Sequence, residues 1–144
     1  YKLPVYFNDH KDWEKVKSVT GFSKTEIIGK LVAAELSISM FGFLPGFMYL
    51  SGLDPSLHVP RKNIPAKYVK ANSIALGGNY VGLYSIDSPG GWQVIGQIPI
   101  AILKTSQLPP VDLKMGDQIK LHPIDQITFE NILEKNISLK EYNG

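Results

Sequence analysis

The sequence holds 144 residues, of which 44% are hydrophobic and 19% charged, a composition typical of a single folded domain. It contains no cysteine, so disulfide-rich scaffolds and thiolate zinc sites are excluded. The 15 basic and 13 acidic side chains nearly balance, which gives no reason to expect nucleic acid as a partner. Its longest apolar runs fall far short of the roughly 18 residues of a membrane span, so we expect no membrane insertion and a cytoplasmic protein.

The first third of the chain predicts a strand and two short helices. We expect the strand at Val5–Phe7, followed by a helix that Asp9 caps and Gly21 ends. Ser23 and Glu26 form the pattern of a capping box, which predicts a second helix. Two helices around a glycine turn could bind DNA, but the second helix carries only two lysines and nothing suited to reading bases. We therefore favour helices that pack on a sheet.

The middle of the chain predicts short strands joined by tight turns, because most of its Gly and Pro residues lie between positions 42 and 99. Near the end, Asp125 is expected to cap a further helix. Many short strands with a few helices at the edge indicate a mainly β fold, either a small barrel or a sandwich. The expected strands are Leu36–Met40, Ser73–Leu76, Val81–Ile86, Gln93–Gln97, Ile100–Leu103 and Gln118–His122.

Familiar catalytic motifs are missing: there is no Walker A loop, no G-x-G-x-x-G, no H-E-x-x-H and no G-x-S-x-G. His10, His58 and His122 are too scattered in the sequence to suggest a metal cluster. We therefore expect no metal and no cofactor bound by this chain.

Four cationic residues, Arg61, Lys62, Lys67 and Lys70, lie within ten positions and have no acid among them. A solvated loop is the simpler interpretation of this stretch, and an anion-binding edge is the alternative.

Aromatic and turn residues concentrate in two segments, Phe41–Leu50 and Ser88–Trp92. Paired glycines allow a ligand or another strand to approach the backbone, and tryptophan offers a broad face with one hydrogen-bond donor. Composition leaves two interpretations open. The aromatic side chains either form the core of a barrel or line a binding groove.

The string GFLPGFMYLSGLDPSLHVPR, followed by SPGGWQVIG, resembles the signature of the family of the 5-oxoprolinase B subunit, also called allophanate hydrolase subunit 1 or the KipI kinase-inhibitor family. The resemblance extends over nearly the whole chain, including the late turn Met115-Gly116-Asp117. It implies a cyclophilin-like closed β-barrel with short flanking helices, a carboxyltransferase-type domain over residues 1–144. It also implies that a small α/β domain, which precedes the barrel in the family, is absent from this sequence.

The resemblance implies a bacterial subunit that acts with partners like the A and C subunits of 5-oxoprolinase, in a complex that uses ATP to open 5-oxoproline to glutamate. One family member instead inhibits a sporulation histidine kinase, so a regulatory binding module is the alternative. Prolyl isomerase activity would rest on analogy of fold alone. No catalytic nucleophile is evident. The residues expected to line a surface groove for substrate or partner are Phe43, Pro45, Gly46, Phe47, Tyr49, Arg61, Ser88, Pro89, Gly90, Gly91 and Trp92.

At three positions the chain departs from the family pattern: Leu31 replaces a histidine, and Ala66 and Gln97 replace arginines. Neither Ala nor Gln can supply the bidentate, charged grip of a guanidinium on a carboxylate or phosphate. Arg61 is therefore the best remaining anion anchor, and the amides of the Ser88–Gly91 loop are expected to donate to an oxyanion. These losses leave catalysis and partner binding as alternatives.

Overall fold

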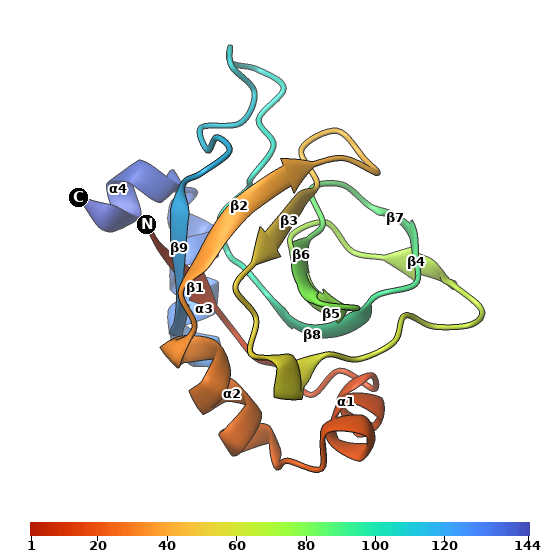
Figure 1. Ribbon diagram of the computed structural model, residues 1–144. Coiled ribbons are helices and arrows are strands. Elements are labelled where there is room, and N and C mark those ends of the chain that lie inside the picture. Colours follow the sequence, from red (N-terminus) through yellow and green to blue (C-terminus); the bar gives the residue numbers. More distant parts are fainter.

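The computed structural model describes residues 1–144 and places seven strands in one sheet that curls into a nearly closed barrel (Figure 1). The strand order is β1-β9-β2-β3-β6-β5-β8, and a separate two-stranded ribbon pairs β4 with β7. No helix is long and apolar enough to cross a membrane. In chain order the elements are β1 (Lys2–Val5), α1 (Trp13–Thr20), α2 (Lys24–Ala33), β2 (Leu36–Phe41), β3 (Met48–Ser51), the 3-10 turn η1 (Pro55–Leu57), β4 (Ala66–Val69), β5 (Ser73–Gly77), β6 (Tyr80–Leu83), β7 (Ser88–Gly90), β8 (Gln93–Gln97), β9 (Gln118–Pro123), α3 (Gln126–Lys135) and α4 (Leu139–Asn143).

Tyr6 and Gln97 join the two outer strands of the sheet. Each residue donates its backbone N–H to the carbonyl of the other at 2.9 Å. Because Tyr6 follows β1 and Gln97 ends β8, this bridge brings the first and last strands together. The prediction of a mainly β, cyclophilin-like barrel with short flanking helices is confirmed.

Most of the core is one cluster of 27 buried hydrophobic residues, which includes side chains from the barrel strands and from the helices. Leu31 of α2 belongs to this cluster and is completely buried. An apolar side chain at this position is therefore explained by packing, since it stabilises the contact between α2 and the sheet. A second, smaller cluster of six buried residues consists of Phe47, Val69, Ala75, Tyr84, Trp92 and Val94.

The signals at the helix ends were mostly correct. Gly21 ends α1 in a left-handed conformation with φ of 74°, and Ser23 and Glu26 complete the capping box of α2. Asp125 accepts a hydrogen bond from the Thr128 amide at 2.7 Å and caps α3. The prediction that Asp9 caps α1 is wrong, because the helix begins only at Trp13.

Several predicted strands need correction. The first strand is Lys2–Val5, and β6 ends at Leu83, so the predicted strand Val81–Ile86 is too long at its end, although Tyr84 still forms backbone hydrogen bonds with Asn72 and Ser73. Ile100–Leu103 is not a strand: Ile100 and Ile102 are buried, and this alternation produced a strand-like pattern without any strand to pair with. Strands β3, β4 and β7 were not predicted, because each has only three or four residues and lies within a turn-rich segment.

Candidate functional site

The aromatic residues of the two conspicuous segments meet in one cluster around Phe47. The ring centroids of Phe43, Tyr49, Tyr84 and Trp92 all lie 5.0–5.4 Å from that of Phe47, in edge-to-face arrangements. Phe47 is completely buried and Trp92 is 3% exposed, whereas Phe43 is 56% exposed. This cluster is therefore a second small core, with Phe43 as its exposed edge.

Glycines of the barrel make room for these rings. A Cβ atom on Gly77 would lie 2.6 Å from the Trp92 ring, and one on Gly82 would lie 2.8 Å from the Phe47 ring. Both distances are too short for any side chain, so only glycine allows the indole to lie flat against β5 and β6.

The Ser88–Trp92 loop rests on this cluster. Gly90 lies directly against the Tyr84 hydroxyl, which leaves no space for a side chain. Burial raises the pKa of Tyr84 to about 12, against an opposing effect of the Trp92 backbone, and the buried hydroxyls of Tyr84 and Ser88 make no hydrogen bond of normal geometry. Gly91 accepts a hydrogen bond from the Lys62 amide at 2.6 Å, so this loop uses a carbonyl to anchor the cationic stretch. Ser88 has no base beside it and is not an activated nucleophile.

Arg61 stacks on the outer side of the cluster, with its guanidinium carbon 4.8 Å from the centroid of the Trp92 ring. Among the eleven residues expected to line a groove, Arg61 is the only one that lines a cavity, and that cavity is a shallow one beside Asp12 and Lys15. Of the eleven residues, Phe47, Gly90 and Trp92 are buried, whereas Phe43, Pro45, Arg61 and Pro89 are exposed, and the role of the set as a binding groove stays a prediction. The residues that line no cavity are Phe43, Pro45, Gly46, Phe47, Tyr49, Ser88, Pro89, Gly90, Gly91 and Trp92.

A different cavity gathers cationic side chains. It has a volume of about 360 Å³ and contains Ala66 and Gln97, the two positions where the sequence departs from the family pattern. Three of its eleven lining residues are lysines and none is Asp or Glu, so we call it the lysine pocket. Its lining residues are Asn8, His10, Lys11, Lys62, Ala66, Tyr68, Val69, Lys70, Ser73, Val94 and Gln97.

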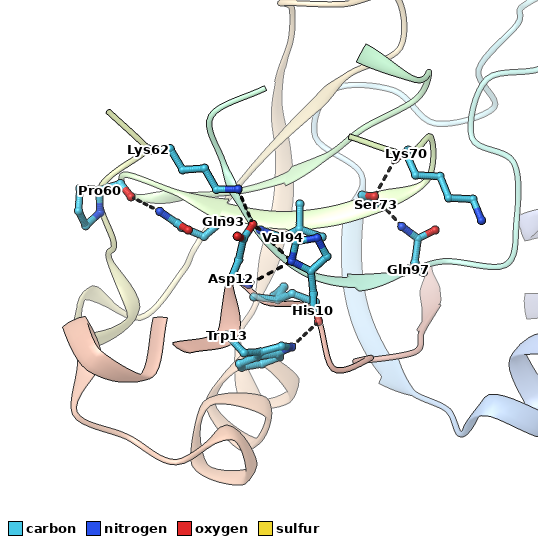
Figure 2. A network of polar contacts seen from close by, with 11 residues as sticks. His10, Asp12, Trp13, Pro60, Lys62, Lys70, Ser73, Gln93, Val94 and Gln97 are labelled. Carbon is cyan, nitrogen blue, oxygen red and sulfur yellow. Dashed lines mark hydrogen bonds and ion pairs between the residues drawn. The ribbon is translucent and has the colours of Figure 1, made fainter. Parts of the chain in front are cut away.

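Behind one wall of the lysine pocket lies a buried ion pair (Figure 2). The Lys62 ammonium is 2.9 Å from Asp12 Oδ2, and the same oxygen accepts the Val94 N–H at 2.9 Å. Asp12 is 6% exposed and Lys62 is 18% exposed. The Asp12 carboxylate is thus neutralised by Lys62, and it contributes little negative potential to the pocket.

His10 lies next to this pair, in the loop that leads from the barrel into α1. Its Nδ1 accepts a hydrogen bond from the Asp12 amide at 3.1 Å. Burial lowers the pKa of His10; the Asp12 carboxylate opposes this effect, and the charges of Lys62 and Lys11 add to it. No pattern in the sequence singled out His10, because a lone histidine before a helix is usually a surface residue.

The opposite wall is held by Ser73 and Gln97 (Figure 2). The Gln97 amide donates to Ser73 Oγ at 2.6 Å, and Ser73 donates to the Lys70 carbonyl at 2.6 Å. This chain of bonds positions the backbone of Lys70 at the pocket edge. The side chains of Lys70 and Lys11 form no ion pair with any carboxylate of the protein.

These features suit the binding of a small anion. Lys11 and Lys70 offer unpaired positive charges, and Asn8, His10 and Gln97 offer polar groups around them. No group of three or more His, Asp or Glu side chains lies close enough to share a metal ion. The sequence pointed to Lys70, Ala66 and Gln97, but not to their meeting with the Asn8–Asp12 segment.

A family model described as "Carboxyltransferase domain, subdomain C and D" matches residues 1–113. The chain is 34% identical over 137 residues to the 5-oxoprolinase B subunit of Bacillus subtilis and 43% identical over 122 residues to that of Haemophilus influenzae. These matches cover 94% and 83% of this chain, and the chain spans 57% of each relative.

Solved structures agree with this likeness. A conserved uncharacterized protein of Pyrococcus horikoshii superimposes with a TM-score of 0.84 at 35% identity, over 90% of this chain and 61% of that one. The urea amidolyase of Kluyveromyces lactis, at 22% identity, shares the fold with a TM-score of 0.79 over 94% of this chain and 10% of its own. The sequence, the barrel and these relatives together show that the chain belongs to the carboxyltransferase domain family, subdomains C and D, alongside the 5-oxoprolinase B subunit.

Proposed function

We propose that the protein is a subunit of a multi-component, ATP-dependent 5-oxoprolinase, and that its lysine pocket holds the substrate or an intermediate. The relatives named as 5-oxoprolinase B subunits support the reaction. The observation that supports the role of the pocket is its charge: Lys11 and Lys70, two lysines without a carboxylate partner, line a cavity of about 360 Å³ that has no Asp or Glu in its lining. A carboxylate such as that of 5-oxoproline would be attracted there.

Within this proposal each part of the pocket has a separate role. Lys11 and Lys70 lack carboxylate partners, so either ammonium can pair with the substrate carboxylate. Lys62 is paired with Asp12, so this pair adds little net charge to the wall of the pocket. Partners resembling the A and C subunits of 5-oxoprolinase would supply the groups for ATP use and ring opening, because the lysine pocket contains no nucleophile paired with a base.

The test is to co-express the full-length protein with its partner subunits and to measure glutamate release from 5-oxoproline with and without ATP. In Lys70→Gln we expect KM to rise about 10-fold or more, as for the loss of a charged hydrogen bond. Lys67→Gln is the matched control, because Lys67 is an exposed lysine of β4 outside the pocket. The proposal fails if the assembled subunits release no glutamate, or if both variants behave like the wild type.

The alternative function, inhibition of a histidine kinase through an aromatic groove, has less support. Phe47 and Trp92 are buried, so Phe43 is the one strongly exposed ring of the cluster. A contact through Phe43 alone would offer a partner only a small apolar surface. The neighbouring genes would discriminate: genes for partner subunits favour the enzyme, and a gene for a sensor kinase favours the regulator.

A further inference from the structure

The imidazole of His10 has its hydrogen-bonding roles set by the backbone. Nδ1 lies 3.1 Å from the Asp12 amide nitrogen, and a backbone N–H can only donate. Nδ1 must therefore be the unprotonated acceptor. In the neutral ring the single proton is then on Nε2, which has no hydrogen-bond partner in the protein.

A competing contact would favour the opposite arrangement. The Asp12 carboxylate lies 3.5 Å from Nδ1, and a carboxylate attracts a protonated, cationic imidazole. This distance is at the limit of a hydrogen bond, and the same Oδ2 atom already accepts from Lys62 and Val94 at 2.9 Å. The charged groups around the ring are Asp12, Lys62 and Lys11, and together with burial their net effect is to lower the pKa of His10. The geometry and the charges agree on a neutral ring.

A pocket that holds both ammonium groups and a neutral N–H donor can bind two different kinds of ligand group. Ammonium groups prefer a carboxylate or phosphate, whereas an uncharged imidazole N–H suits a carbonyl oxygen. His10 lines the lysine pocket together with Lys11 and Lys70. A ligand with one anionic group and one uncharged carbonyl could use both kinds of donor at once.

We propose that His10 is the carbonyl-binding residue of the lysine pocket, donating from Nε2 to an amide or lactam oxygen while Lys11 or Lys70 binds the anionic group of the same molecule. The inference rests on the proposed function in taking this pocket as the substrate site. It adds that the substrate must carry an uncharged carbonyl as well as an anion, and that His10 recognises that carbonyl without transferring a proton.

The first test is the state of the ring in the full-length protein, observed by nitrogen NMR of labelled histidine. We expect His10 at pH 7 to show an unprotonated Nδ1 and a protonated Nε2, with its signals assigned from a His10→Gln variant. His58 is an exposed histidine and serves as the internal reference. A proton on Nδ1, or a cationic ring at pH 7, would overturn the proposal.

The second test uses two probes, 5-oxoproline and cyclopentanecarboxylate, which share a five-membered ring, a carboxylate and the same net charge but differ in the lactam group. We expect 5-oxoproline to shift the His10 Nε2–H signal and cyclopentanecarboxylate to leave it unchanged. In His10→Phe, which keeps a ring but removes the donor, the affinity for 5-oxoproline should fall about 3- to 10-fold. In His10→Gln, which restores an amide donor, most of this loss should be recovered.

The outcomes separate this inference from the proposed function. The inference is wrong if 5-oxoproline leaves His10 unperturbed, if cyclopentanecarboxylate perturbs it equally, or if His10→Gln binds 5-oxoproline as weakly as His10→Phe while remaining folded. If the assembled complex releases no glutamate but 5-oxoproline still perturbs His10 as expected, the proposed reaction fails and carbonyl binding by His10 stands.

Discussion

Replacing Lys62 by methionine would leave the Asp12 carboxylate buried without its cation. Breaking a fully buried ion pair costs about 3–5 kcal/mol. Lys62 keeps 18% of its surface exposed, which lets water reach the pair, so we expect Lys62→Met to lower the free energy of unfolding by about 2–3 kcal/mol. The cost arises from the charge that remains, since methionine fills much of the same space.

Replacing the other partner of the ion pair, Asp12, should lower the free energy of unfolding by less. In Asp12→Asn the amide oxygen can still accept the Val94 N–H, and the freed Lys62 ammonium can turn toward solvent. We expect a loss of about 1 kcal/mol, the size of one ordinary hydrogen bond. The double variant should cost little more than Asp12→Asn alone, because it contains no stranded charge.

Urea denaturation of the full-length protein and of the three variants provides the double-mutant cycle. The expected coupling energy is about 2 kcal/mol. Additive effects, or a cost below about 0.5 kcal/mol for Lys62→Met, would show that the pair is too well hydrated to behave as a buried one, and the description of this wall of the pocket would be wrong.

Three further predictions concern the barrel and its helices, and each is measured by urea denaturation. Gly77→Ala should lower the free energy of unfolding by about 1–3 kcal/mol, because the added methyl group would lie 2.6 Å from the Trp92 ring. Gly29→Ala in α2 has nothing within 4 Å of the added methyl group and should raise the free energy of unfolding by about 0.5–1 kcal/mol. Equal effects of the two variants would contradict the close contact at Gly77. Tyr84→Phe should change the free energy of unfolding by less than about 1 kcal/mol at pH 7, because the buried hydroxyl makes no hydrogen bond of normal geometry. The folded-state pKa of Tyr84 is raised to about 12, so the unfolded chain ionises first and the wild type should lose stability from pH 10 toward pH 12, a loss that should be smaller in the variant. Ser23→Ala should lower the free energy of unfolding by about 1 kcal/mol, because α2 loses its N-terminal cap. An unchanged free energy of unfolding would mean that the capping box does not stabilise α2.

Local sequence patterns predicted the structure correctly where it depends on residues that are close together in the sequence. The capping box at Ser23 and the glycine stop at Gly21 involve residues within four positions, so the pattern and the structure agree. Asp9 failed as a cap because the polar run before α1 contains several candidates. Asp12 stands closest to the helix, yet its carboxylate binds the Val94 amide, 82 positions away. A contact at that separation leaves no periodic trace in the sequence.

In the candidate site, too, the sequence indicated the local features but not the contacts between distant segments. The aromatic and glycine clusters were correctly identified as unusual, but composition could not distinguish rings inside a barrel from rings along a groove. The lysine pocket is assembled from four separate stretches of the chain, with Asn8 and His10 before α1 and Gln97 at the end of β8. No single stretch looks like a binding site, because each contributes only one or a few side chains.

The central claim of the proposed function is that 5-oxoproline binds in the lysine pocket rather than beside Arg61 and Trp92. A crystal structure of the full-length protein with 5-oxoproline would distinguish them. We expect the carboxylate beside Lys11 or Lys70 and the lactam oxygen within hydrogen-bond distance of His10 Nε2. A ligand bound against Arg61 and the Ser88–Trp92 loop, with the lysine pocket left to water, would contradict the proposal.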